Sequence, residues 1–356
     1  MSAPDGAGQA AEPVAYHRIA RLRPEWSRPA KPLLALGAAL LTYVLVISVV
    51  LVGTVLVLAL TPGVDPALGA TSGDPTSPLD VGLALLMGAA WLPAGIVGVR
   101  VGGWRPLGTA WAVTAAFRPG QLRWCAPWVL GGGLLVVASA AIAGAITGGA
   151  DGGAPGVAPA DGAAVAAGPS PLAAAALVLL VLVLAPVQAA GLELALRGIV
   201  LQAAGTWLRA PAAALLPVLA LVLIGRELTP AVVVPALAAA LCSGVLAWRS
   251  GGLELPIALT TMLTIAALLT SAFCAGTSAG IGISSLVAGL AAPGTSGTAL
   301  AAADSPAALA GAVAGSVALL LVTAALLVLL GRREGTGPLR PSVRDASAPA
   351  PAPLGV

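Results

Sequence analysis

Apolar residues occur along this chain in long runs separated by short polar stretches. The runs cover residues 33–60, 81–99, 128–147, 172–190, 211–225, 231–248, 253–273 and 307–330. Most of them approach the roughly 20 residues that an α-helix needs to cross the apolar core of a bilayer. No stretch alternates polar and apolar positions as the strands of an outer-membrane barrel do, so helices must satisfy the backbone in lipid. The pattern predicts an all-α, polytopic transmembrane bundle of about eight helices.

Two stretches leave the number of spans open by about one. The run 211–225 is short and contains Pro217, so it could be a buried or re-entrant segment. Within 275–306, Ile281–Leu290 could lie at the interface or dip into the membrane. The first run is much longer than the apolar part of a signal peptide and follows some thirty polar residues, so we expect it to stay in the mature protein.

Composition excludes a water-soluble protein. Apolar residues make up 58% of the chain and charged residues 9%, with a mean hydropathy of +1.00, whereas a soluble domain is about a quarter charged. Residues 1–32 and 335–356 are rich in Pro, Ala, Gly and Ser, which predicts two disordered cytoplasmic tails around a transmembrane domain at 33–334. The many Ala and Gly positions between them favour close helix packing.

The basic residues predict the orientation. With the N-terminus inside, every predicted outer segment carries acidic residues, and Arg226 is the one basic residue outside. The inner segments hold His17, Arg18, Arg21, Arg23, Arg28, Lys31, Arg100, Arg105, Arg118, Arg123, Arg209, Arg249, Arg332, Arg333, Arg340 and Arg344. The positive-inside rule then predicts a plasma-membrane protein with both termini cytoplasmic. The high pI of about 9.1 follows from this topology, and we expect no nucleic-acid partner.

Residues 103–128 and the three cysteines have plain structural explanations. Arginines alternate with four tryptophans over 103–128, a composition typical of an anchor at the inner headgroup layer, although a binding role is also open. Cys125, Cys242 and Cys274 form no CxxC pair and lie in or beside apolar segments, so we expect small core residues.

Glu193 and Arg197 are the informative charges within the spans. A charge at the centre of a membrane helix costs on the order of 2.5–3.5 kcal/mol, so such residues are candidates for function. Their i,i+4 spacing places both on one helix face, with the acid N-terminal to the base. They could equally form a self-neutralising structural pair. Arg226-Glu227 is expected to be a solvated outer turn, and Glu254 an interfacial residue at the start of the seventh span.

The run Gln188–Arg209 resembles the first motif of the CAAX protease and bacteriocin-processing (CPBP) family of intramembrane proteases, in which two adjacent glutamates are followed three residues later by Arg-Gly. Residues 247–258 resemble the lead-in to the family's last motif. Tyr16–Ala20 and Trp104–Trp124 resemble the lead-in of its bacterial members. The family hydrolyses peptide bonds within the membrane. Its glutamates and two histidines are thought to hold a metal that activates water, and an Asn supports the oxyanion.

Matched to the first motif, this chain retains one of the two glutamates. The first falls on Leu192, the second on Glu193 and the arginine on Arg197. The similarity is strongest over 188–264, which implies a CPBP-like core over about 172–273, in spans four to seven.

The other two motifs have lost their functional side chains. The family's Phe-x-x-x-His falls on Val222 and Arg226, and a shift of one residue would place Gly225 at the histidine. The closing His-x-x-x-Asn falls on Thr260 and Thr264. None of these residues binds a metal as an imidazole does.

The inventory of ligands argues against hydrolysis. A catalytic zinc generally needs three protein ligands, but the one histidine of the chain, His17, lies in the N-terminal tail. The spans offer Glu193 and, at most, Cys242 or Cys274. The HExxH, aspartyl-pair and Ser-His alternatives are absent as well.

Three hypotheses follow. The first is a catalytically inactive member that keeps the fold and binds or regulates membrane proteins, with Glu193 and Arg197 as a structural clamp and no cofactor. Its partners would be membrane lipids, together with prenylated or transmembrane peptides or another membrane protein. The second is an active endopeptidase with substituted ligands, which would bind zinc. The third is a transporter or permease subunit whose polar path includes Glu193 and Arg197.

Overall fold

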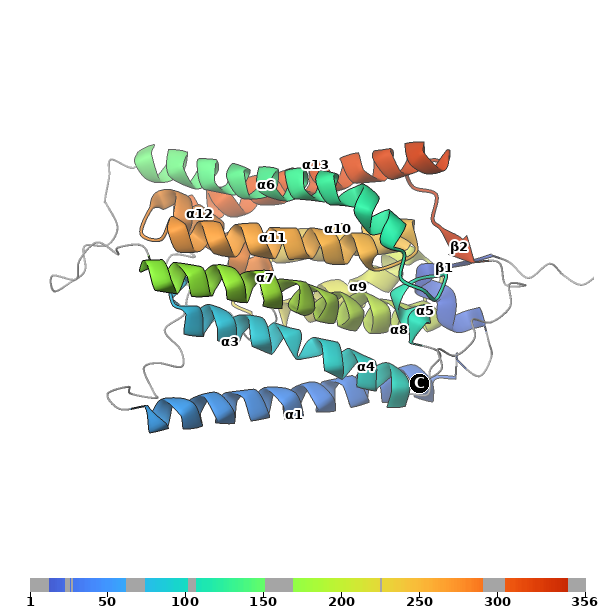
Figure 1. Cartoon of the computed structure of the whole chain (residues 1–356). Coiled ribbons are helices and arrows are strands. Elements are labelled where there is room, and N and C mark those ends of the chain that lie inside the picture. The colour runs from blue at the N-terminus through green and yellow to red at the C-terminus, as the bar shows by residue number, and fades with distance from the viewer. Residues whose placement is uncertain are drawn as a thin grey trace, which may run out of the picture.

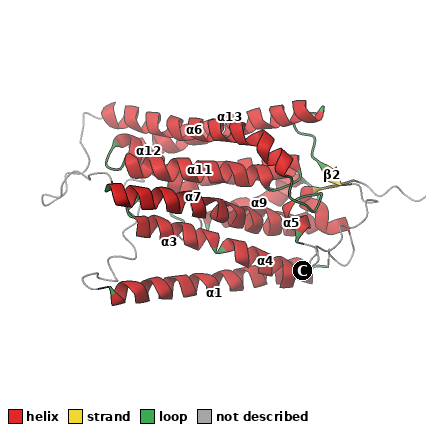
Figure 2. Cartoon of the chain, in the orientation of Figure 1, coloured by secondary structure: helices red, strands yellow, loops and turns green. Residues whose placement is uncertain are grey.

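The computed structural model of the chain is a bundle of roughly parallel helices (Figure 1). It describes residues 13–22, 26, 28–61, 74–101, 107–150, 169–224, 226–290 and 305–344. Figure 2 shows that helices account for nearly all of the described chain. Seven described helical segments are long and apolar enough to span a membrane. The protein is therefore an all-α, multi-pass membrane protein, as the hydrophobic pattern predicts.

The seven long segments are α1, α3 with α4, α6, α7 continuing through η2 and α8, α10, α11 and α13. Their bounds are Ala30–Leu60 (α1), Pro78–Ala89 (α3), Trp91–Val101 (α4), Pro119–Ala150 (α6), Pro171–Glu193 (α7), Leu194–Leu201 (η2), Gln202–Trp207 (α8), Pro230–Ser250 (α10), Glu254–Phe273 (α11) and Pro306–Glu334 (α13). The shorter elements are Val14–Ala15 (β1), Tyr16–Leu22 (η1), Gly108–Trp111 (α5), Pro211–Leu223 (α9), Ser278–Leu290 (α12) and Val343–Arg344 (β2).

The short fifth run fits the buried or re-entrant alternative better than a full span. The run 211–225 forms the 13-residue helix α9, which is about 20 Å long and shorter than the roughly 30 Å apolar core of a bilayer. Helix α12, also of 13 residues, is the second short apolar helix. It packs against α6, α10, α11 and α13, so of the two options for 281–290 the structure favours entry into the bundle.

Three helices begin at a Ser-Pro step. Ser77, Ser170 and Ser305 each accept a hydrogen bond from the backbone N–H three residues later, and each precedes a proline in the first turn of α3, α7 or α13. The serine satisfies one of the unpaired N–H groups at the helix start, and proline tolerates that position because it has no N–H to satisfy. The polar breaks between the apolar runs therefore also begin the helices.

Glycines let α6, α12 and α13 approach closely. A Cβ added at Gly144 would lie 2.9 Å from the Cα of Gly282, and one added at Gly311 would lie 2.4 Å from the same atom. Only residues without a side chain fit at this triple crossing, as expected where close packing rather than the hydrophobic effect holds helices together. The predicted role of small residues is confirmed here.

One end of the bundle gathers the basic residues, and we call it the basic end. Here α1 and α6 begin, α10 and α13 end, and β1 pairs antiparallel with β2 (Figure 1). Helix α9 also starts at this end, directly after α8, and α10 returns to it. Apart from Arg197 and Arg226, all described basic residues lie in segments at this end. They are His17, Arg18, Arg21, Arg28, Lys31, Arg100, Arg118, Arg123, Arg209, Arg249, Arg332, Arg333, Arg340 and Arg344.

The two tails are ordered where they meet the basic end, which corrects the expectation of disorder at 14–22 and 335–344. Tyr16 is fully buried and donates a hydrogen bond of 2.5 Å to the carbonyl of Ala110. Arg249 is also fully buried, and it donates to Glu334, to Thr336 and to the carbonyl of Pro338. Burial of the apolar residues of η1 thus holds the N-terminal segment in place, and the hydrogen bonds of Arg249 hold the C-terminal one.

Candidate functional site

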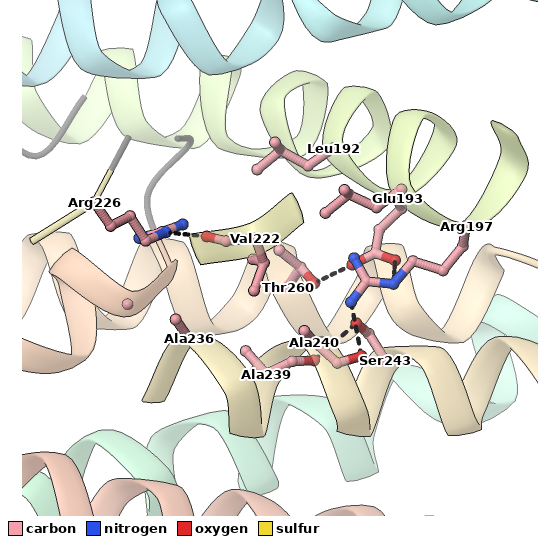
Figure 3. A pocket seen from close by; sticks show the side chains of 12 residues that line it. Leu192, Glu193, Arg197, Val222, Arg226, Ala236, Ala239, Ala240, Ser243 and Thr260 are labelled. Atoms are coloured by element: carbon pink, nitrogen blue, oxygen red, sulfur yellow. Dashed lines mark hydrogen bonds and ion pairs between the residues drawn. The ribbon is translucent and has the colours of Figure 1, made fainter. Parts of the chain in front are cut away.

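The sequence motifs that lie far apart in the chain converge on one cavity inside the bundle, which we call the embedded cavity (Figure 3). Its walls come from α7 and η2, α9 and the turn after it, α10, α11 and the end of α12. The lining residues are Leu192, Glu193, Leu196, Arg197, Val222, Arg226, Ala236, Ala239, Ala240, Ser243, Thr260 and Gly289. Six of the seven motif positions therefore meet.

Glu193 is the one carboxylate among these lining residues, and two helices hold it. Its Oε2 lies 3.4 Å from Nε of Arg197, an i,i+4 ion pair as the spacing predicts. Its Oε1 accepts a hydrogen bond of 2.9 Å from the hydroxyl of Thr260 on α11. Both charged side chains are nearly fully buried. The carboxylate thus joins α7 to α11.

Arg197 links its ion pair with Glu193 to a third helix, α10. Its Nη2 donates a hydrogen bond of 2.9 Å to the carbonyl of Ala240 on α10. Nε of Arg197 and Oε2 of Glu193 attract each other as charges, but neither atom makes a hydrogen bond within the described chain. Buried polar atoms of this kind are usually satisfied by a partner or by ordered water. Oε2 can therefore accept a hydrogen bond from a polar group that enters the cavity, and Nε can donate one.

A π-helical stretch places this pair. Residues Leu194–Leu201 form η2, which begins directly after Glu193 and includes Arg197. π-helical turns are rare and frequently occur at functional sites. Sequence reasoning treated the whole segment as a regular helix, and no signal in the sequence marked the change.

Arg226 lines the same cavity, which corrects the expectation of a solvated residue near the outer face and away from Glu193. Arg226 is only 8% exposed, whereas its neighbour Glu227 is exposed as expected. The guanidinium donates to the carbonyl of Val222 at the end of α9 (2.6 Å) and to the carbonyl of Ala288 at the end of α12. Cations are favourable at helix C-termini, where carbonyls lack partners. Arg226 thus joins the ends of the two short helices.

The embedded cavity is small and lies deep. The space open to the centres of water molecules is about 40 Å³, enough for a few waters. Ala240 lies ten residues before the end of α10 at Ser250, so the cavity is roughly 15 Å from the basic end. Leu196, Ala239 and Thr260 keep partial exposure. The cavity is therefore not sealed from the outside of the bundle.

The residues of the cavity do not fit zinc. Zinc needs about three nitrogen, oxygen or sulfur ligands in a tetrahedral set. Among the described residues, no three His, Cys, Asp or Glu side chains lie close enough together to hold a metal ion. The cavity instead combines Glu193 with the guanidinium groups of Arg197 and Arg226. An approaching dication would meet two positive charges and one negative charge. No hydrolytic step through a metal follows from this donor set.

The remaining predicted residues lie outside the embedded cavity. Thr264, one turn beyond Thr260, is buried but does not line it. Cys242 is buried in the apolar cluster between α10 and α13, as expected for a core residue. Gly225, the alternative to Arg226, lies outside the described residues.

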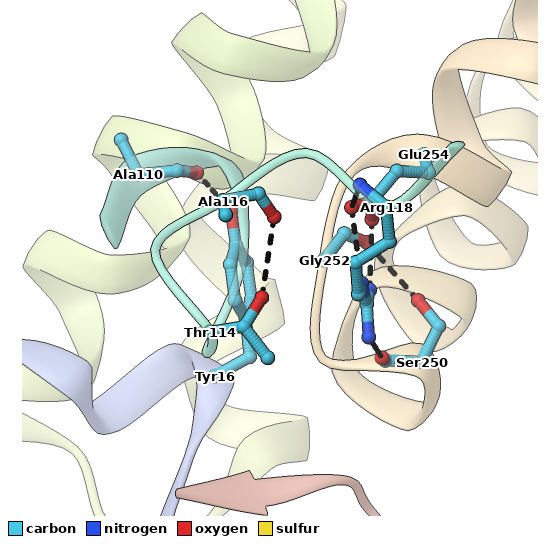
Figure 4. Close-up of polar contacts among 8 residues, drawn as sticks. All are labelled: Tyr16, Ala110, Thr114, Ala116, Arg118, Ser250, Gly252 and Glu254. Carbon is cyan, nitrogen blue, oxygen red and sulfur yellow. Dashed lines mark hydrogen bonds and ion pairs between the residues drawn. The ribbon is translucent and has the colours of Figure 1, made fainter. Parts of the chain in front are cut away.

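Glu254, expected to be interfacial, is 2% exposed and pairs with Arg118 at the basic end (Figure 4). Arg118 donates from Nε to Oε1 (3.0 Å) and from Nη2 to Oε2 (2.8 Å). Such a bidentate pair is both strong and geometrically specific. Sequence reasoning identified Arg118 only as part of an interfacial anchor, because its partner lies 136 residues away.

Sequence reasoning also missed the small residues of the cavity wall. Ala236, Ala239, Ala240 and Ser243 come from consecutive turns of α10. Their i, i+3, i+4 and i+7 spacing marks one helix face, which is a signal that could have been found.

No family model matches the chain, and no curated protein or solved structure matches it either.

Proposed function

We propose that this protein is a non-proteolytic membrane protein with a CPBP-protease-like core, which binds a membrane-embedded segment of another protein at the embedded cavity. We further propose that it lies in the plasma membrane with its basic end, and hence both termini, in the cytoplasm. The skew of basic residues to that end supports this orientation.

One observation carries the proposal. Motif positions from three separate parts of the chain converge on one cavity, yet their side chains offer one carboxylate and two guanidinium groups. Those charges are engaged in holding helices together: Glu193 with Thr260, Arg197 with a carbonyl of α10, and Arg226 with two helix ends. The arrangement supports a stable scaffold with a recess and, within the described residues, offers no set of ligands for a metal that would activate water.

The size of the recess selects the guest. About 40 Å³ of space for water centres admits the tip of one side chain but not a whole prenyl chain, since small-molecule pockets typically measure about 300–1,000 Å³. Oε2 of Glu193 and Nε of Arg197, which attract each other but make no hydrogen bond within the described residues, favour a tip that can hydrogen-bond. A transmembrane helix bearing one Ser, Thr, Asn or Gln side chain has this chemistry.

The test uses the purified full-length protein in lipid nanodiscs. A fluorescent transmembrane peptide with one central Asn is titrated with and without added Zn²⁺, and both its anisotropy and its length are measured. We expect saturable binding without cleavage. Ala239→Phe fills the cavity and should abolish binding, whereas Leu241→Phe, on an exposed position of the same helix, should leave it unchanged.

Two results would overturn the proposal. Metal-dependent shortening of the peptide that disappears in Glu193→Gln would establish an active endopeptidase. Binding that is equal for the Asn peptide, an all-Leu peptide and the Ala239→Phe variant would show that the cavity does not take part.

A carrier is the second candidate, because two half-length helices meet inside the bundle. The C-terminal ends of α9 and α12 face Arg226, and many carriers bind their substrates where discontinuous helices end near the middle of the membrane. Solute flux into proteoliposomes that requires Glu193 would favour this function. Absence of flux together with saturable peptide binding favours the first.

A further inference from the structure

A second cavity, separate from the embedded cavity, opens at the basic end between the start of α6 and the end of α13. We call it the interfacial cavity, and its lining residues are Arg118, Gly120, Gln121, Leu330, Arg333 and Glu334. The space open to water centres is about 330 Å³, ample for a hydrated phosphate group. Its lining is cationic and rich in hydrogen-bond donors.

Arg118 is fixed in the wall with donors to spare. Its bonds to Glu254 and one from Nη1 to the carbonyl of Ser250 use three of the five N–H groups of its guanidinium (Figure 4). Its side chain lines the cavity and is 23% exposed. A guanidinium held in this way loses little conformational freedom when it binds an oxyanion.

Arg333 supplies the charge that the protein does not neutralise. Its guanidinium lies 4.6 Å from the ring centre of Trp124, a cation–π contact that positions it. Arg333 has no acidic partner within the described chain, whereas Glu334 is paired with Arg249 at 2.7 Å. The carboxylate in the lining is thus compensated, and a net positive charge faces the cavity.

Gln121 is the independent indication of a missing partner. It lies in the first turn of α6 and is only 9% exposed, and its amide nitrogen has no hydrogen-bond partner within the described chain. The same turn presents the N-terminus of a 32-residue helix, and a Cβ at Gly120 would meet nothing within 4 Å. Helix N-termini with open approach favour anions. The turn therefore combines an unsatisfied donor with a favourable helix dipole.

Position indicates the source of the anion. Trp124 and Trp128 follow on the same helix, and Trp128 is 49% exposed on the outside of the bundle. Tryptophan side chains concentrate at the depth of lipid headgroups. Basic cavities between transmembrane helices at this depth suit anionic lipid headgroups.

We propose that the interfacial cavity binds the phosphate of an anionic phospholipid headgroup, with Arg118, Gln121 and Arg333 donating to its oxygens. The acyl chains would lie along the exposed apolar face of α6 beside Trp128. The lipid would brace the start of α6 against the end of α13 and so anchor the basic end at the headgroup layer.

The test measures headgroup preference by native mass spectrometry. Delipidated full-length protein is mixed with equal amounts of phosphatidylglycerol and phosphatidylcholine, and the lipid adducts are compared. We expect wild type to prefer phosphatidylglycerol. Arg333→Gln should lower the affinity for phosphatidylglycerol about fivefold, as expected for one arginine at an anionic surface. Gln121→Leu should also lower the affinity for phosphatidylglycerol, although it leaves the net charge unchanged.

Arg332→Gln is the matched control, because it removes the same charge from an exposed neighbour that does not line the cavity. An equal loss in Arg332→Gln and Arg333→Gln would reveal diffuse attraction and overturn the proposal. Displacement of phosphatidylglycerol by millimolar inorganic phosphate would also overturn it, since the site would then belong to the free anion. A Gln121→Leu variant that prefers phosphatidylglycerol as strongly as wild type does would overturn it as well, because the unpaired amide would then play no part in binding.

Discussion

The buried ion pair of Glu193 and Arg197 can be tested by a double-mutant cycle. The variants are Glu193→Gln, Arg197→Met and their combination. Glutamine keeps the shape of glutamate and can still accept from Thr260, whereas methionine fills the volume of the arginine stem. Each single variant therefore removes one charge with little change in packing.

The geometry sets the magnitude. Two unit charges 3.4 Å apart attract by about 5 kcal/mol at an effective dielectric constant of about 20. Both side chains are nearly fully buried, so a single substitution leaves the other charge without its partner and should cost about 3–5 kcal/mol. The double variant leaves no unpaired charge and should cost less than either single, which corresponds to a coupling energy of at least about 3 kcal/mol.

The free energy of unfolding is measured in mixed micelles with increasing dodecyl sulfate, followed by far-UV circular dichroism. Arg209→Met is the control, because Arg209 is exposed at the basic end and its loss should cost under about 0.5 kcal/mol. If the Glu193 and Arg197 single variants cost no more than this control and their effects add, water screens the pair. The clamp that joins α7, α10 and α11 would then not exist.

Three further predictions concern the basic end and the helix crossing. Gly311→Val should destabilise the protein by about 2 kcal/mol or more, because its Cβ would overlap the backbone of α12, whereas Gly131→Val, which meets nothing within 4 Å, should be near neutral in the same unfolding assay. Glu254→Gln should cost about 2–3 kcal/mol by weakening the charge-assisted bonds from Arg118, seen as a lower Tm. Burial lowers the pKa of His17 below 6.5, so protonation favours the undocked segment, and stability contributed by docking is lost as the pH falls below about 6.5. The amide protection factors of residues 16–22, corrected for the pH dependence of intrinsic exchange, should therefore fall from pH 7.5 to pH 5.5, and protection factors that do not change with pH would contradict this assignment.

The hydrophobic runs predicted most of the fold because the requirement for membrane spans is written locally. A helix in lipid must be long, apolar and internally hydrogen-bonded, and seven described segments meet these conditions near the predicted bounds. The run 211–225 forms the short helix α9, which ends at Leu223, in line with the buried or re-entrant alternative that the sequence left open. Length alone gave the relevant signal, since 13 residues reach only about 20 Å.

The candidate site was predictable in its local part only. The spacing of Glu193 and Arg197 predicted their ion pair, which is confirmed at 3.4 Å. Arg226 was misplaced because a strict alternation of full spans puts the loop between spans five and six outside, whereas the side chain of Arg226 is buried against the ends of α9 and α12. The partners of Arg118 and Arg249 are set by tertiary contacts over 136 and 85 residues, for which periodicity carries no information.

The two arginines of the embedded cavity hold its walls together without metal ligands. Here Arg226 binds the ends of α9 and α12, and Arg197 binds Glu193 and the carbonyl of Ala240. Each guanidinium is a fixed cation that satisfies backbone carbonyls as well as charge. The groups that hold the walls of the cavity together are therefore side chains of the chain itself, so we expect its stability to be unchanged by strong chelators of divalent metals.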